Sequence, residues 1–152
     1  MNNCYCGSAA GYAQCCKPLH QGQAASSPEA LMRSRYSAFV LVNADYLLKS
    51  WHPSTRPTEL ELNLEDVWCG LKVLNSEQLT ASGKVHFQAV FKEQVDKKAA
   101  QFFIIDENSN FVLEAGHWFY VDGLPVITQL KPQRNDICPC NTGLKFKKCC
   151  GK

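Results

Sequence analysis

The sequence predicts an α+β protein in which helices pack on a curved antiparallel sheet, with a small cysteine-rich knuckle at each end. A capped helical pattern occupies residues 27–51, and segments rich in Val, Phe and Ile follow it from residue 67 to residue 123. Helices that precede a run of antiparallel strands usually bury their apolar faces against one side of that sheet. The third observation is a cysteine pattern that occurs at both ends of the chain.

Two helices are expected before the sheet. The tripeptide Ser-Pro-Glu at 27–29 supplies an N-cap, a proline at the first helical position and an acid in the first turn. Apolar side chains near helical spacing continue this helix through residues 29–42. Asn43 then starts a second, shorter helix over ADYLLKSW (44–51), which the prolines at 53 and 57 close.

The strands are predicted where the hydrophobic period changes. Val85, Phe87, Ala89 and Phe91 alternate clearly with polar residues. Turn residues at 107–110 and at Asp122-Gly123 predict the connections between strands. The expected strand segments are VWCGLKVLN (67–75), KVHFQAVFKEQV (84–95), AAQFFIID (99–106) and NFVLEAGHWFYVDG (110–123).

Composition indicates one ordinary globular domain with small appendages. The chain has 152 residues, of which 45% are hydrophobic and 20% charged. No apolar run approaches the roughly 18 residues that span a bilayer. The first residues lack the basic and apolar regions of a signal peptide, so a reducing, cytoplasmic location is expected. Nine cysteines in such a compartment indicate metal binding rather than stable disulfides.

The two ends repeat one cysteine pattern. CYCGSAAGYAQCCK (4–17) aligns without a gap with CPCNTGLKFKKCCG (138–151), which leaves only Cys69 outside the repeat. Each copy supplies four thiols, the ligand number of a closed structural zinc site. The alternatives are disulfide or redox pairs, disfavoured by the matched spacing, and iron–sulfur clusters, which usually have wider spacings. The expected ligands of two zinc ions are Cys4, Cys6, Cys15 and Cys16, and Cys138, Cys140, Cys149 and Cys150.

The residues between the cysteine pairs suggest how each knuckle folds. Turn-forming residues follow the first pair in both copies, and we expect Ser8 or Thr142 to cap a short helix that runs into the second pair. Tyr12 and Phe146 occupy matching positions. Either aromatic ring is expected to anchor its knuckle to a larger body.

Both ends resemble the SEC-C motif, the zinc knuckle in the C-terminal tail of the preprotein translocase ATPase. The tail copy has the C-P-C, the lysine-rich segment and the C-C-G of that pattern, whereas the N-terminal copy keeps the cysteines without the lysines. A SEC-C knuckle at each end is similar to the YchJ family, as are the segments ALMRSRYSAFV and YLLKSWHPSTRP.

The middle of the chain resembles the cone-shaped nuclear-transport-factor-like fold, also called cystatin-like α+β. This resemblance implies a pocket between helix and sheet. It also implies a division into an N-terminal knuckle (1–20), a middle domain (26–130) and a C-terminal knuckle (134–152). In the translocase the SEC-C motif contacts a secretion chaperone, which implies a capacity to dock proteins here.

Metal binding changes the charge of the chain. Eight thiolates contribute −8 and two zinc ions +4 to the formal charge of +2, which leaves a balance of −2. Lys145, Lys147 and Lys148 surround the tail site and have two interpretations. They neutralise the zinc–thiolate cluster, or they form a basic patch for an acidic partner such as a protein, a lipid headgroup or RNA.

Two classes of function therefore compete. The first is a non-catalytic zinc adaptor that docks a chaperone-, translocase- or ribosome-associated protein through the tail knuckle. The alternative is a small-molecule-binding protein or enzyme that uses the middle pocket, with Arg35, Tyr36, His52 and His117 as candidate pocket residues. Nucleic-acid binding is disfavoured because the metal-bound balance is acidic and no long basic stripe exists.

The pocket candidates also have structural interpretations. We expect Arg35 to contact a carboxylate such as Asp45, or a carbonyl group. His52 lies at a helix end and His117 lies beside two aromatic residues, so capping and packing are the ordinary roles of these side chains. The sequence contains no defensible catalytic triad and no phosphate-binding loop. Cys69 is expected to be a buried apolar thiol.

Overall fold

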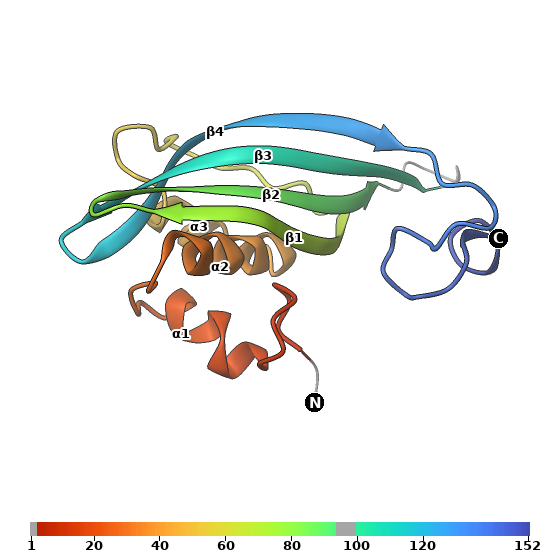
Figure 1. The fold of residues 1–152 in the computed structure, drawn as a ribbon, viewed down its shortest axis with the longest axis horizontal. Helices are drawn as coiled ribbons and strands as arrows, with labels where there is room; N and C mark the ends of the chain where they lie inside the picture. The colour runs from red at the N-terminus through yellow and green to blue at the C-terminus, as the bar shows by residue number, and fades with distance from the viewer. Residues whose placement is uncertain (1–2, 94–99) are drawn as a thin grey trace.

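A computed structural model of the chain describes residues 3–93 and 100–152. A four-stranded antiparallel sheet with strand order β1-β2-β3-β4 forms one layer, and helices cover one of its faces (Figure 1). The predicted α+β class with a curved antiparallel sheet is confirmed. The strands are β1 (Asp66–Gln78), β2 (Ser82–Glu93), β3 (Gln101–Glu114) and β4 (His117–Leu130). The α-helices are α1 (Cys16–His20), α2 (Pro28–Val40) and α3 (Ala44–Lys49), and two short 3₁₀ helices are η1 (Tyr12–Gln14) and η2 (Phe146–Lys148).

The two predicted helix starts are confirmed. The Ser27 hydroxyl accepts the Ala30 N–H at the start of α2, and the Asn43 side chain accepts the Tyr46 N–H at the start of α3. Helix α2 is shorter than the predicted helix, which runs to residue 42. It ends at Val40, and Val42 takes a left-handed φ of 57° that redirects the chain into α3.

The main core lies between α2 and one face of the sheet. Leu31, Met32 and Tyr36 of α2 are buried against Val85 and Phe87 of β2. Alternate residues of a strand point to opposite faces, so Val90 and Lys92 belong to the other face. The sheet thus has a helix-covered face and an opposite face, and each receives a different end of the chain.

Both predicted hairpin turns are wrong. Residues 107–110 lie inside β3 and Asp122-Gly123 lies inside β4, because the two strands pair over almost their full length. The Asn110 amide donates to the Asp122 carboxylate across the strands, so these polar residues form a ladder rather than a turn. The turn lies instead at Ala115-Gly116, whose φ values of 50° and 80° suit a tight hairpin. The predicted segments 84–95 and 99–106 also include residues 94, 95 and 99, which lie outside the described residues.

The two ends of the chain occupy different faces. The N-terminal segment and α1 lie against the side of α2 that faces away from the sheet, and the C-terminal segment lies beyond the end of β4 (Figure 1). Cys138 packs with Phe102, which alternates with the helix-side residue Phe103 and so faces away from α2. None of the helices in the described ranges is both long and apolar enough to cross a membrane.

Candidate metal centres and central cavity

The first cysteine tetrad is part of the main core. The sulfur atoms of Cys4, Cys6, Cys15 and Cys16 all lie within 4.8 Å of one another, and three of the four side chains are buried. Gly7 follows the first pair with a φ of 89°, which an L side chain rarely adopts, so the chain turns tightly beneath the sulfur atoms. The structure therefore brings together all four N-terminal residues predicted as metal ligands.

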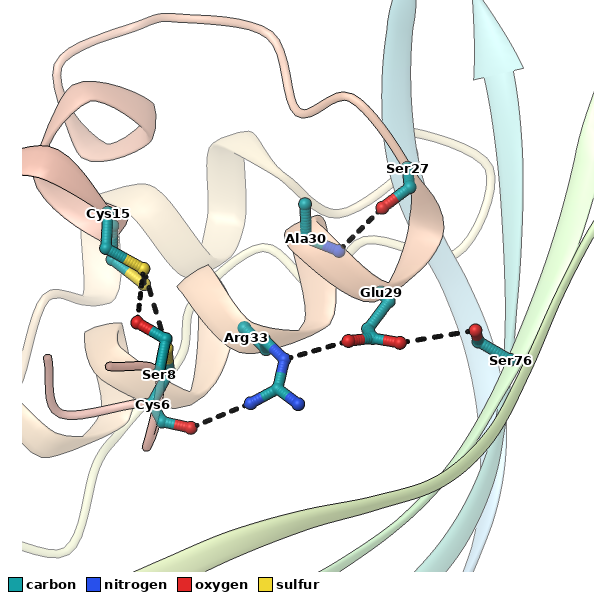
Figure 2. A network of polar contacts seen from close by, with 9 residues as sticks. Cys6, Ser8, Cys15, Ser27, Glu29, Ala30, Arg33 and Ser76 are labelled. Atoms are coloured by element: carbon teal, nitrogen blue, oxygen red, sulfur yellow. Dashed lines mark hydrogen bonds and ion pairs between the residues drawn. The ribbon is translucent and has the colours of Figure 1, made fainter. Parts of the chain in front are cut away.

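A polar network ties this tetrad to α2. Figure 2 shows Arg33 between the loop and the helix: its Nη1 donates to the Cys6 carbonyl at 3.0 Å, and its Nε donates to Glu29 Oε2 at 3.0 Å. Ser76 of β1 donates to the other oxygen of Glu29 at 3.3 Å. The cysteine loop, the helix and the sheet edge are thus held by one chain of charge-assisted contacts.

His20 makes a second link between the N-terminal knuckle and α2. Its Nε2 lies 2.8 Å from the Ser34 carbonyl, which can only accept, so Nε2 carries a proton. Its Nδ1 lies 2.8 Å from the Tyr12 hydroxyl and, in the neutral ring, accepts a hydrogen bond that this hydroxyl donates. Tyr12, predicted as an anchor, therefore acts through both its ring and its hydroxyl group.

The second tetrad lies closer to solvent. The sulfur atoms of Cys138, Cys140, Cys149 and Cys150 also lie within 4.8 Å of one another, but only Cys138 is buried. Asn141 and Gly143 take left-handed φ values of 71° and 85°, which reverse the chain between the two cysteine pairs. The eight predicted ligands thus form two separate groups, as the repeat predicts.

The C-terminal knuckle is attached to the sheet face opposite α2. The ring of Phe146 meets Phe102 edge-on at a centroid distance of 6.3 Å, as predicted for an anchoring aromatic. Lys92 of β2 points at this knuckle, and its Nζ lies 3.7 Å from Cys150 Sγ. Cys69 is buried in the same apolar cluster, as predicted. Sequence reasoning missed Lys92. The one signal was that Lys92 alternates with the apolar, helix-side residues of β2 and therefore lies on the other face of the sheet.

Ser8 and Thr142 do not cap helices, contrary to prediction. The N-cap positions of η1 and η2 are Gly11 and Lys145, and neither makes a side-chain capping bond. The Ser8 hydroxyl instead donates to Cys15 Sγ at 3.1 Å, and Thr142 Oγ1 lies 3.3 Å from Cys149 Sγ. The reason is geometric: each hydroxyl lies in the turn that follows the first cysteine pair, which places it beside the sulfur atoms rather than at the start of a helix.

The donor sets fit a divalent metal ion. A hydrogen bond from Cys16 lowers the pKa of Cys6 to about 4, and the same contact raises the pKa of Cys16. Burial would raise the pKa of Cys140, but hydrogen bonds with Thr142 and neighbouring thiols lower it to about 6, whereas burial raises that of Cys150 to about 12. In each tetrad the ionisation of one thiol raises the pKa of a neighbouring thiol. A bound cation would offset this repulsion and allow all four thiols to ionise.

A cavity of about 200 Å³ lies between α2 and the sheet. Arg35 and Tyr36 line it from α2, and Trp51 lines it from the end of α3. Trp68, Phe87, Ala89, Ile105, Glu107 and Tyr120 line it from the four strands. Aromatic rings therefore form most of the wall, and Arg35 and Glu107 bring opposite charges to it.

Arg35 is held by carbonyl and hydroxyl groups rather than by Asp45. Its Nη1 donates to the Leu47 carbonyl at 2.8 Å and to Ser50 Oγ at 2.6 Å. The guanidinium lies over the ring of Tyr120 at 4.5 Å. Burial lowers the pKa of Arg35 to about 10, so it remains protonated at neutral pH.

The two histidines do not line this cavity, although all four pocket candidates were expected to share one site. His52 turns outward, where its ring bonds with Glu114 at 2.8 Å and with Ser54 at 2.7 Å. His117 is exposed at the start of β4 and borders a separate depression beside His20. Strand alternation and the loop after α3 direct both rings away from α2.

Comparison with known proteins assigns the family. Residues 27–123 match the family model described as the YchJ middle NTF2-like domain, and residues 134–152 match the SEC-C motif. The chain belongs to the YchJ family. The SEC-C match and the two cysteine tetrads together indicate metal binding.

Two relatives match almost the whole of this YchJ family chain. A UPF0225 protein of Photorhabdus laumondii is 42% identical over 97% of this chain and 98% of its own. One from an Enterobacter strain is 44% identical over 98% and 97%.

Two solved structures have the same architecture. A SEC-C motif-containing protein of Rhodopseudomonas palustris has 34% identity and a TM-score of 0.70, over 83% of this chain and 99% of its own. A sec-c motif-containing protein of Psychrobacter arcticus has 28% identity and a TM-score of 0.64, over 99% and 96%.

Proposed function

We propose that this protein is a non-catalytic zinc adaptor that works in the cytoplasm. Each tetrad holds one structural zinc ion, and the C-terminal knuckle docks an acidic segment of a protein partner through Lys145, Lys147 and Lys148. A four-thiolate donor set with no open position suits structural zinc and leaves the ion no catalytic role.

The placement of Lys92 carries this proposal. A zinc ion with four thiolates has a net charge of −2, and a nearby cation stabilises it. Lys92 supplies that cation from the middle domain, with Nζ 3.7 Å from Cys150 Sγ. Across residues 3–93 and 100–152, no hydrogen bond joins the tail lysines to sulfur, and Lys145 and Lys148 are exposed. The tail lysines are therefore available to bind a partner, because they do not contact the zinc–thiolate cluster through hydrogen bonds.

The exposed side of the knuckle supports the same interpretation. Leu144 and Ile137 flank the lysines and are 50% and 63% exposed. Apolar side chains beside a cluster of lysines form a surface that suits a protein segment with both apolar and acidic residues. The N-terminal knuckle lacks this combination, since Gly11, Ala13 and Gln14 occupy the matching positions.

Affinity purification of the metal-loaded full chain from its own cells tests the proposal. Substitution of Lys145, Lys147 and Lys148 by Glu is expected to remove a specific co-purified protein while the chain still binds two equivalents of zinc. A matched control reverses the charge of Lys49, Lys72 and Lys84, three exposed lysines on α3, β1 and β2. If both triple variants retain the same partners, docking through the knuckle is excluded.

A further inference from the structure

The central cavity is built around a buried charge that the adaptor role does not use. Arg35 is 4% exposed, and the free-energy cost of desolvating its guanidinium has to be offset by contacts within the fold. Two such contacts are the hydrogen bonds that Nη1 donates to the Leu47 carbonyl and the Ser50 hydroxyl. A packed apolar side chain would fill this position at lower cost, so the cavity retains its charge at the expense of stability.

The remaining N–H groups of Arg35 reach the cavity. Among the described residues, every fully buried side-chain nitrogen and oxygen has a hydrogen-bond partner. Both hydrogen bonds of Arg35 come from Nη1. Nε and Nη2 have no such partner in the part of the chain that the structure describes and are therefore not fully buried, so they border the open space of the cavity. A guanidinium edge directed into a cavity is a donor for a ligand atom that accepts hydrogen bonds.

Glu107 supplies the complementary group. It lies on the cavity wall from β3, and its Oε2 accepts the hydroxyl of Ser109. The carboxylate lies tightly over Gly123 of β4, where an added Cβ would come within 2.4 Å of Oε2, so the side chain has little freedom to turn away. Burial and this carboxylate together raise the pKa of Tyr120 to about 12, which keeps the phenol neutral. Glu107 thus presents a constrained acceptor to the same cavity that Arg35 lines.

The walls set the shape of the ligand. Tyr36, Phe39, Trp51, Trp68 and Tyr120 surround the space with flat rings, which favour a flat ligand. An engineered cavity of about 150 Å³ binds benzene, so a cavity of about 200 Å³ admits a ring system somewhat larger than one benzene ring. The two wall charges cancel, which disfavours a ligand with a net charge of its own.

We propose that the cavity between α2 and the sheet binds a neutral, planar heteroaromatic molecule that accepts a hydrogen bond from Arg35 and donates one to Glu107. Half-buried Trp51, Ile105 and Glu107 lie at its rim and give access from solvent. Binding at this site is independent of the C-terminal knuckle, so it is a second property of the chain rather than a version of docking.

Nuclear magnetic resonance titration of the metal-loaded full chain tests this site directly. The indole N–H signals of Trp51 and Trp68 report on the cavity, and that of buried Trp118, which does not line it, is the internal control. The probes are adenine, which donates and accepts, indole, which only donates, and the anion benzoate. Adenine is expected to shift the two cavity signals saturably and to bind about tenfold or more tightly than indole or benzoate. No saturable shift with adenine, or equal binding of all three, overturns the proposal.

Variants of adjacent residues locate the site. Glu107→Gln keeps the acceptor for Ser109 but removes the charge, and it is expected to weaken adenine binding about tenfold. Asp106→Asn makes the same chemical change one residue away on the opposite face of the sheet and is expected to leave binding within about twofold. Ala89→Leu fills the cavity and is expected to abolish the shifts while the chain stays folded. Equal affinity in Glu107→Gln and Asp106→Asn, or undiminished binding in Ala89→Leu, excludes the cavity.

Discussion

The two knuckles carry the same cysteine spacing but are attached to the molecule in different ways. Cys6 of the N-terminal tetrad is 0% exposed and belongs to the main core with α2. Its counterpart Cys140 is half-buried and belongs to a small cluster on the opposite face of the sheet. The same metal chemistry therefore serves as part of the fold at one end and as a surface module at the other.

The contacts around each tetrad explain this difference. Arg33 donates one hydrogen bond to the Cys6 carbonyl of the N-terminal loop and another to Glu29 of α2, which fixes the loop against the helix. Lys92 reaches the C-terminal tetrad with a single contact to sulfur at the end of a flexible stem. Residue type thus decides whether a knuckle is built into the protein or merely held against it.

Loss of one ligand from each tetrad gives the largest expected contrast. Cys6→Ser removes a metal ligand inside the main core and is expected to lower the free energy of unfolding by about 3 kcal/mol or more. For a domain of this size that loss lowers Tm by roughly 6–12 °C. Cys140→Ser is expected to change the unfolding of the middle domain by less than about 1 kcal/mol, because its cluster is separate.

Calorimetry together with elemental analysis checks this contrast. Each variant is expected to lose one of two zinc equivalents. Equal zinc loss would mean that any difference in Tm comes from the place of each knuckle in the fold. Equal shifts in Tm for the two variants would contradict the division into a structural knuckle and a surface knuckle.

Sequence patterns identified the parts of the molecule that depend on local chemistry. Ser27 and Asn43 mark helix starts because the cap bond is made within three residues. The eight cysteines align because both loops meet the same requirement, four sulfur atoms around one point. The first three predicted strand segments lie within or overlap β1, β2 and β3, since period-two alternation is a local signal. The fourth, 110–123, is wrong as a single strand, because it crosses the Ala115-Gly116 turn from β3 into β4.

Contacts between distant segments could not be predicted in this way. The polar residues at 107–110 resemble a turn, and only pairing with β4 shows that they form a ladder. Arg33 and Lys92 occupy ordinary positions on a helix and a strand, and nothing nearby in the sequence reveals that they meet the cysteines. His52 and His117 have the chemistry of pocket residues, but their direction depends on the loop after α3 and on the register of β4.

The two basic anchors provide a contrast of intermediate size. Arg33→Met removes a hydrogen bond to the Cys6 carbonyl and the ion pair with Glu29, and is expected to cost about 1.5–3 kcal/mol. Lys92→Met is expected to cost less than about 1 kcal/mol, because its single long contact lies near the surface. Urea unfolding of both variants measures these costs.

The rate of zinc transfer to a chelator separates anchoring from general stability. Arg33→Met is expected to speed release from the N-terminal site, and Lys92→Met to speed release from the C-terminal site, each with little effect on the other. A single rate change shared by both sites would mean that the anchors act on the whole fold.

The smallest contrast concerns the matching aromatic residues Tyr12 and Phe146. Tyr12→Phe removes the hydroxyl that donates to His20 Nδ1 and is expected to lower the free energy of unfolding by about 1 kcal/mol. Tyr5→Phe is the matched control, because Tyr5 is 47% exposed and meets Tyr12 only through its ring. Urea unfolding distinguishes the two, and nitrogen chemical shifts of His20 report whether the ring keeps its proton on Nε2. Since Phe146 has no hydroxyl group, a cost confined to Tyr12 would show that the N-terminal knuckle gains directed polar contacts where the C-terminal knuckle relies on apolar packing. If Tyr12→Phe and Tyr5→Phe are equally mild, the link through His20 contributes nothing to that difference.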